Sequence, residues 1–352
     1  MAEVLGIGCT HYPPGLVPDE YCPWPLPFQL RSDPRIPERL KDPRNWPPAM
    51  REEWANDQGV AAHAPQAARM REAFRRLRAE IDGFRPDLIV IWGDDQYENF
   101  REEIIPPFCV QAYDELPCKP FHKIGKLPNV WGEPNDKVFQ FRGHREAGKY
   151  LVSEALRAGI DMSYSYRTRA GDGVGHAFAN TLLFLDWDRK GFDYPVVPIS
   201  VNAYGRRVIS YQGGILERST DVDPPSPSPA RCFALGQSVA KAIRQSPWRT
   251  VLIASASWSH AFLCDKHSWI YPDRAADAML LSQLKAGAYR DWSTLTTDWI
   301  EDTGEQEFLS WICLAGAMDE LAARPEVIEW LDTWVFNAAK CFAVFRPPPP
   351  LV

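Results

Sequence analysis

Two histidines and one aspartate have the residue types and positions of a metal site. His11 follows an apolar run at residues 4–9, and His63 precedes a stretch with helical periodicity. The sequence holds only 7 histidines in 352 residues, which makes two at the borders of predicted elements notable. Asp273 adds a carboxylate, although it could instead cap a helix. Because two imidazoles and one carboxylate form the facial triad that binds non-haem Fe(II), we predict that these three residues bind Fe(II).

Other polar side chains follow the predicted strands. In an α/β sheet, ligands gather beyond the carboxyl ends of the strands, so these side chains should converge. One such side chain alone is more often structural than functional, and it is the convergence of several that favours a site. Besides His11, the residues in these positions are Asp94, Asp95, Asn202, Ser259 and His260. We predict that Asp95, Asn202 and Tyr204 contact a substrate.

The composition limits the classes of protein to consider. The net charge is −7 and no extended basic run is present, which argues against nucleic acid as a partner. No apolar run approaches the roughly 18 residues of a membrane helix, and the first residues lack the features of a secretion signal. The 8 cysteines are scattered, so neither a disulfide framework nor a cysteine-based zinc site is indicated. We therefore expect a cytoplasmic protein without a membrane or nucleic-acid partner.

Apolar runs alternate with segments of helical periodicity. This alternation is typical of an α/β protein, and we predict one domain over 1–352 with a central mixed sheet flanked by helices. Proline-rich loops at 13–48 and 106–134 are expected to lie over the site. One helix at 64–81 should end at Gly83. The other predicted helices are 144–158, 176–185, 230–245, 273–286 and 305–322, and the predicted strands are 4–9, 87–93, 161–166, 194–201, 250–256 and 334–345.

Six short segments occur in the order found in one known family. Gly8-Cys9-Thr10-His11 and Ala62-His63-Ala64 carry the first two histidines, and Ser257-Trp258-Ser259-His260 contains a Ser-His turn. The remaining segments are 86–95, 171–178 and 304–318. Together they resemble the class III extradiol ring-cleavage dioxygenases, the superfamily of the protocatechuate 4,5-dioxygenase β-subunit.

The resemblance implies a function and a role for each site residue. An enzyme of this kind uses Fe(II) to insert both atoms of O2 into a catecholic ring and cleave it (meta cleavage). His11 and His63 would be the first two iron ligands, and Asp273 would stand where the family usually has glutamate. His176, at the start of a predicted helix, would be the catalytic acid and base. His260 would assist catalysis by orienting the substrate or a ligand.

One departure from the family pattern leaves other functions open. The strand that ends at Gly93 is commonly followed by histidine in the family, whereas this chain has Asp94-Asp95-Gln96-Tyr97-Glu98. A metalloenzyme of the same fold acting on a non-catechol substrate, by another oxidation or by zinc-dependent hydrolysis, is therefore an alternative. A non-catalytic metal-binding protein is a second alternative. The expected partners are a catechol and O2, and we expect a homodimer, with a small partner subunit left open.

Overall fold

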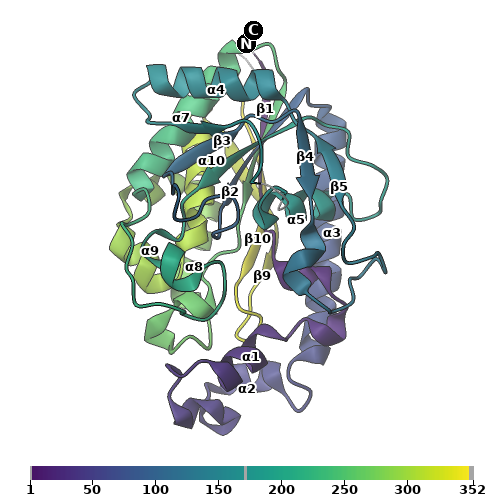
Figure 1. Ribbon diagram of the computed structural model, residues 1–352, viewed down its shortest axis with the longest axis vertical. Helices are drawn as coiled ribbons and strands as arrows, with labels where there is room; N and C mark the ends of the chain where they lie inside the picture. Colours follow the sequence, from purple (N-terminus) through teal and green to yellow (C-terminus); the bar gives the residue numbers. More distant parts are fainter. Residues whose placement is uncertain (1, 170–172, 349–352) are drawn as a thin grey trace.

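The structure is a computed structural model that describes residues 2–169 and 173–348. Its centre is an eight-stranded mixed sheet with the strand order β6-β3-β7-β2-β8-β1-β10-β9 (Figure 1). The strands are β1 (Val4–Cys9), β2 (Leu88–Asp94), β3 (Phe108–Gln111), β6 (Ser163–Ser165), β7 (Val196–Val201), β8 (Thr250–Ser255), β9 (Arg324–Leu331) and β10 (Lys340–Arg346). A separate two-stranded sheet pairs β4 (Glu115–Cys118) with β5 (Phe139–Arg142).

The middle of the large sheet is parallel. β8 pairs in parallel with β1 on one side and with β2 on the other, and β2 pairs in parallel with β7. β10 joins β1 in the antiparallel sense, and β3 joins β7 in the same way. The carboxyl ends of β1, β2, β7 and β8 therefore lie along one edge of the sheet, which is where α/β proteins bind ligands.

Two hydrophobic cores lie on opposite faces of the sheet. In β2, Val90 and Trp92 belong to one core, whereas Ile89 and Ile91 belong to the other. Every residue of β2 is buried, as expected for a strand that is covered on both faces. The first core packs against α4 (Arg145–Arg157), α7 (Pro229–Gln245), α8 (Arg274–Ala286) and α10 (Leu309–Glu320), and the second against α3 (Val60–Phe84) and α5 (His176–Leu185). The predicted α/β class, with a mixed sheet flanked by helices, is confirmed.

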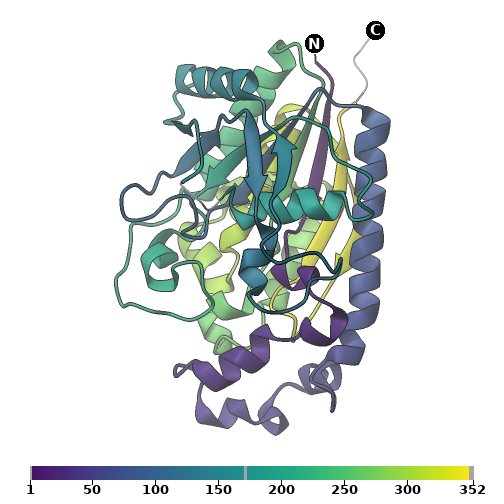
Figure 2. The same ribbon diagram turned by 45° about the vertical axis from the view of Figure 1, so that its right-hand side comes forward.

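The predicted helix at 64–81 is part of the longer helix α3, which runs beside β9 and β10 (Figure 2). Its buried positions follow the expected helical spacing, from Ala67 through Phe74 to Ile81. The helix continues past Gly83, so the prediction that Gly83 ends it is wrong. Arg85 takes the left-handed conformation instead, with φ of 52°, and its backbone N–H bonds the carbonyl of Ile81.

The proline-rich stretch at 13–48 is more ordered than a loop. It contains α1 (Pro25–Ser32), and α2 (Pro48–Trp54) follows it directly. Proline occupies the first position of both helices, where its missing N–H breaks no helical hydrogen bond. Figure 1 shows both helices beyond the edge of the sheet at which β1 ends.

Some elements differ from the sequence-based expectation. β9 was not predicted, because its residues are mostly half-exposed and include three charged side chains, so they do not form a continuous apolar run. The predicted helix at 305–322 begins with a 3-10 turn at Gln306–Phe308 before α10. The helices α6 (Val208–Tyr211) and α9 (Thr297–Thr303) are short. No helix in the described part of the chain is long and apolar enough to span a membrane. The assignment of 1–352 to one domain stays a prediction.

Helices α7 and α10 approach each other through two glycines. A Cβ atom at Gly236 would lie 1.8 Å from the carbonyl oxygen of Cys313, and one at Gly316 would lie 2.0 Å from that of Phe233. Backbone atoms cannot move aside as a side chain can, so any larger residue would force the two helices apart. This contact supports the core beneath β8, whose end carries part of the site.

We predict that Gly316→Ala lowers the free energy of unfolding by about 1–3 kcal/mol, the usual cost of overpacking a core. The matched control is Gly83→Ala in α3, where an added Cβ meets nothing within 4 Å. That change should raise the free energy of unfolding by about 0.5–1 kcal/mol, because alanine favours a helix over glycine. Denaturant unfolding measures both. Equal effects in the two variants would contradict the close packing of α7 and α10.

Candidate metal centre and pocket

Three buried side chains meet at the carboxyl edge of the sheet. His11 follows β1, Asp94 is the last residue of β2, and His176 is the first residue of α5. One ligand atom from each lies within 4.8 Å of the others, and this is the one such group of histidine, cysteine or acidic side chains among the described residues. The Nε2 atom of His11 lies 3.5 Å from Oδ1 of Asp94. The grouping follows from the sheet order, because β1 and β2 both flank β8 in parallel.

The imidazoles of His11 and His176 each use Nδ1 for a hydrogen bond, which leaves Nε2 to bind a metal. His11 places Nδ1 3.2 Å from the carbonyl oxygen and 3.1 Å from Oγ of Ser255. His176 places Nδ1 2.8 Å from Oε2 of Glu98. Burial lowers the pKa of His11 to about 4 and also lowers the pKa of His176. Both rings are therefore neutral near pH 7, which is the form that binds a metal.

Three carboxylate oxygens beside His11 have no hydrogen-bond partner among the described residues. Neither oxygen of Asp94 has a hydrogen-bond partner within the described residues, and the side chain is fully buried. Glu307 lies across from it, with Oε2 unpartnered and 3.4 Å from Nε2 of His11. Burial raises the pKa of both groups, and their mutual repulsion raises the pKa of Glu307 further. A buried carboxylate without a partner is costly, so this donor set fits a bound cation.

The second oxygen of Glu307 is surrounded by polar groups. Oε1 accepts a hydrogen bond from the Gln96 amide at 2.8 Å and one from the Tyr204 hydroxyl at 3.2 Å. Nε2 of His260 lies 3.3 Å from the same oxygen. Burial lowers the pKa of His260 to about 3, so its ring is neutral near pH 7. Glu307 thus connects His260 to the group around His11.

The turn that carries His260 is braced on several sides. The backbone N–H of Ser259 donates to Oδ1 of Asp277 at 3.1 Å, and the Ser259 hydroxyl donates to the carbonyl of Thr303 at 2.5 Å. The same hydroxyl accepts the backbone N–H of Asp273 at 2.7 Å. His260 itself donates its backbone N–H to the carbonyl of Gly304. The imidazole therefore projects from a rigid support.

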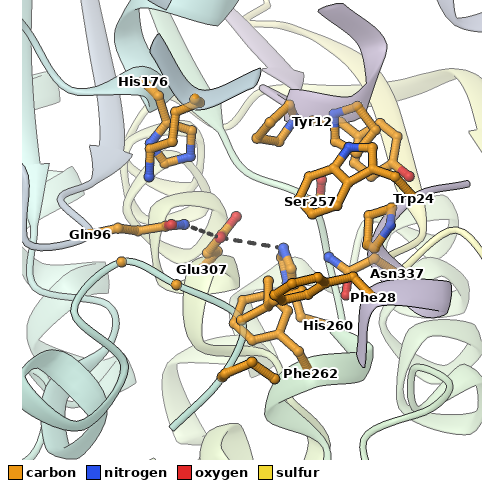
Figure 3. A pocket seen from close by; sticks show the side chains of 18 of the residues that line it. Tyr12, Trp24, Phe28, Gln96, His176, Ser257, His260, Phe262, Glu307 and Asn337 are labelled. Carbon is orange, nitrogen blue, oxygen red and sulfur yellow. Dashed lines mark hydrogen bonds and ion pairs between the residues drawn. The ribbon is translucent and has the colours of Figure 1, made fainter. Parts of the chain in front are cut away.

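A cavity of about 430 Å³ opens onto these groups (Figure 3). His11, His176, His260, Gln96 and Glu307 all line it. Apolar side chains of residues 12–14, Trp24, α1, the 213–218 segment and Phe262 form much of the remaining wall, and Lys123, Ser257 and Asn337 add polar groups. A mostly apolar cavity with a few converging polar groups is the usual form of a small-molecule site.

His63 and Asp273 do not join His11, so the predicted set of three ligands is not assembled. His63 is buried in α3, with its ring against Phe336 and Nδ1 3.5 Å from Oδ1 of Asp19. Asp273 caps α8 by accepting the backbone N–H groups of Ala275 and Ala276. It also pairs with Nζ of Lys266 at 2.6 Å. The carboxylate is thus occupied by its own helix, which is the alternative that the sequence left open.

The three predicted substrate contacts do not line the cavity either. The carboxylate of Asp95 accepts the backbone N–H groups of residues 98–100 and so shapes the turn that holds Glu98. The side chain of Asn202 accepts the N–H of Gly205. Tyr204 reaches the site only through its hydrogen bond to Glu307. Asp95 and Tyr204 thus bond residues of the site, and the substrate contacts of Asp95, Asn202 and Tyr204 stay a prediction.

Several site residues were not identified from the sequence as ligands or contacts. Glu307 lies within the 304–318 segment that carries the family resemblance, and Asp94 stands at a strand end, so both had a detectable signal. No sequence signal marked Glu98 or Lys123 as a site residue. Glu98 contacts the site through His176, and Lys123 comes to lie 3.7 Å from Glu98 only in the folded chain. Within the 171–178 segment, Gly171 and Asp172 lie outside the described residues.

Comparison with known proteins shows similarity to ring-cleaving dioxygenases over part of the chain. Residues 219–335 match the family model of the catalytic LigB subunit of aromatic ring-opening dioxygenase. A 2,3-dihydroxyphenylpropionate/2,3-dihydroxicinnamic acid 1,2-dioxygenase 2 of Pseudomonas putida is 29% identical over 190 residues, which are 54% of this chain and 48% of the relative. The corresponding dioxygenase of Comamonas testosteroni is 31% identical over 189 residues, with the same shares of the two chains. The chain thus spans about half the length of the curated relatives it matches.

A solved structure, that of the uncharacterized protein JW3007 from Escherichia coli K12, aligns with 78% of this chain and 91% of its own, at 13% identity and a TM-score of 0.48. The family model and the curated relatives confirm the resemblance seen in the sequence. The chain is thus similar, over residues 219–335 and about half of its length, to proteins of the class III extradiol ring-cleavage dioxygenase superfamily.

Proposed function

We propose that this chain is a metal-dependent dioxygenase that cleaves the ring of a substituted catechol by the extradiol route. The observation that carries the proposal is the buried His11–Asp94–His176 group, which has an unpartnered carboxylate and whose two histidines line a cavity. Its two imidazoles and one carboxylate are the donor set of non-haem Fe(II) oxygenases. The names of the curated relatives support a catecholic substrate with O2 as co-substrate.

We assign the metal to His11, Asp94 and His176, with Glu307 facing the same nitrogen of His11. When bound, Fe(II) would supply open positions for the catechol and O2 and would lower the pKa of a catechol hydroxyl. The protein's part is to keep both imidazoles neutral and correctly turned, through Ser255 and Glu98. The buried carboxylate would offset the charge of the ion.

His260 is the proposed acid and base. Its neutral imidazole lines the cavity and can accept a proton from a catechol hydroxyl, then return it to the ring-opened product. The nearby carboxylate of Glu307 would stabilise the imidazolium that forms between these steps. His176 had this role in the sequence-based hypothesis, but its place beside His11 and Asp94 favours metal binding. A homodimer, a partner subunit and a cytoplasmic location stay predictions.

The first prediction concerns metal binding. Wild-type protein should bind one Fe(II) per chain under anaerobic conditions, and saturation to about 100 times Kd should stabilise it by about 2.7 kcal/mol. Asp94→Asn and His11→Ala should lose most of this stabilisation. His63→Ala and Asp273→Asn are the controls and should keep it, because neither residue meets His11 and asparagine still caps a helix. Binding that survives Asp94→Asn but fails in both controls would restore the triad predicted from the sequence.

The second prediction concerns turnover. Catechols should stimulate oxygen uptake by the Fe(II)-loaded protein, and His260→Gln should slow kcat at least about 100-fold without changing iron content. His176→Ala should instead reduce the iron content. An iron-replete but slow His176→Ala variant would return that residue to the acid and base role. A protein that binds Zn(II) and hydrolyses esters, without oxygen uptake on any catechol, would favour the hydrolase alternative.

A further inference from the structure

One side of the cavity carries most of its aromatic side chains, with the polar side chains of Ser257 and Asn337 beside them. Figure 3 shows His176 and Gln96 on one side, with Trp24 and Phe28 on the side away from them. Trp24 and Phe28 belong to the segment that leads into and forms α1, and the rings of the two residues meet edge to face at 6.5 Å. Phe262, which is 4% exposed, lies next to His260 and extends the apolar surface.

The side of the cavity formed by α1 is held in place by the contacts of Arg35. Arg35, just beyond α1, donates to the Tyr211 hydroxyl and to Oε2 of Glu217, both at 2.7 Å. Its guanidinium also lies over the Trp269 ring at 4.5 Å. Because Glu217 belongs to the 213–218 segment, Arg35 ties the two facing sides of the cavity together. The spacing between α1 and this segment is thereby fixed.

The charged groups around the cavity are mostly engaged. Lys123, which also lines the cavity, lies 3.7 Å from Glu98. Glu217 is paired with Arg35. Arg218 also lines the cavity and is exposed. The surface formed by Trp24, Phe28 and Phe262 thus offers a ligand aromatic contact without a charged partner.

The volume is more than a bare catechol needs. A cavity of about 430 Å³ falls in the range of roughly 300–1,000 Å³ that accommodates drug-sized molecules. A catechol bound at His11 and His260 would leave the aromatic side of the cavity empty. Aromatic side chains bind flat apolar groups by stacked or edge-to-face contacts, so the empty part suits a ring or a branched alkyl group.

We propose that the preferred substrate is a catechol with a neutral aromatic or branched alkyl substituent, which lies against Trp24, Phe28 and Phe262. This inference rests on the proposed function, since it takes the diol to bind at the metal centre. It makes Trp24 and Phe28 specificity-determining residues. Both come from a segment outside residues 219–335, the part of the chain that matches the family model.

The test measures binding without turnover. Anaerobic calorimetry on the Fe(II)-loaded protein compares 4-phenylcatechol with catechol, and 4-phenylphenol with phenol. The phenyl member of each pair should bind at least about tenfold more tightly, because even one methylene in an apolar pocket can be worth that factor. A third comparison uses 3-(2,3-dihydroxyphenyl)propionate, whose substituent carries a negative charge and would report selection by Arg218.

Substitutions at Trp24 and Phe28 test whether these residues produce the preference for the phenyl compounds. In Phe28→Ala and Trp24→Ala the ratio of the two Kd values should fall toward one, whereas Phe28→Leu should keep part of the preference. Phe28 is 38% exposed, so its removal leaves the core intact. Leu156→Ala on α4 is the matched control, because this exposed apolar residue lies at the opposite end of the molecule from α1 (Figure 1). That variant should keep the wild-type ratio.

The outcomes separate the two proposals. The apolar subsite would be overturned by equal Kd values within both pairs of compounds in the wild type, or by an unchanged Kd ratio in both alanine variants. It would also be overturned if 3-(2,3-dihydroxyphenyl)propionate bound more tightly than 4-phenylcatechol. If no catechol supports oxygen uptake while 4-phenylphenol still binds through Phe28, the dioxygenase proposal fails and the subsite stands. Ring cleavage of catechols without any phenyl preference would leave the dioxygenase proposal in place and remove the subsite.

Discussion

The buried carboxylate of Asp94 is the constraint on which the rest of the site depends. It ends a strand that is covered on both faces, and neither of its oxygens has a partner in the described structure. Glu307 brings a second unpartnered oxygen to the same nitrogen of His11. An unpaired charge in such a place costs several kcal/mol, so the chain has to protonate these groups or bind a cation. The adjacent neutral imidazoles make a metal ion the better solution.

Much of the surrounding structure serves to hold a few side chains still. Ser255 fixes the orientation of the His11 ring, and Glu98 fixes that of the His176 ring. Behind these lie further supports, such as the Asp95 carboxylate that shapes the turn of Glu98 and the Asp277 carboxylate that holds Ser259. Second-layer partners of this kind orient metal-binding and catalytic groups, and their loss weakens a site without touching a ligand. Asp95 and Asp273 thus contribute as supports, although their residue types are those of direct participants.

The N-terminal segment gives the site its shape. The ends of the sheet strands and α5 provide His11, Asp94 and His176, whereas α1 and the residues before it close one side of the cavity with aromatic rings. Prolines at the helix starts and the Arg35 contacts make this cover rigid. Reactive groups need fixed positions, which the edge of a parallel sheet provides. The surface that would select a substrate can come from another segment, here α1 and the residues before it.

The sequence by itself determined the α/β class, the place of His11 after the first strand, and the resemblance to the ring-cleaving dioxygenases. Those features are local, because strand alternation, helical spacing and short motifs are read within a few residues. The partners of His11 were decided by the tertiary structure. Asp94 meets His11 because β8 lies between β1 and β2, and this strand order is not visible in the sequence. His63 and Asp273 have suitable chemistry, but one packs against Phe336 and the other caps its own helix, so neither lies in the group of His11, Asp94 and His176.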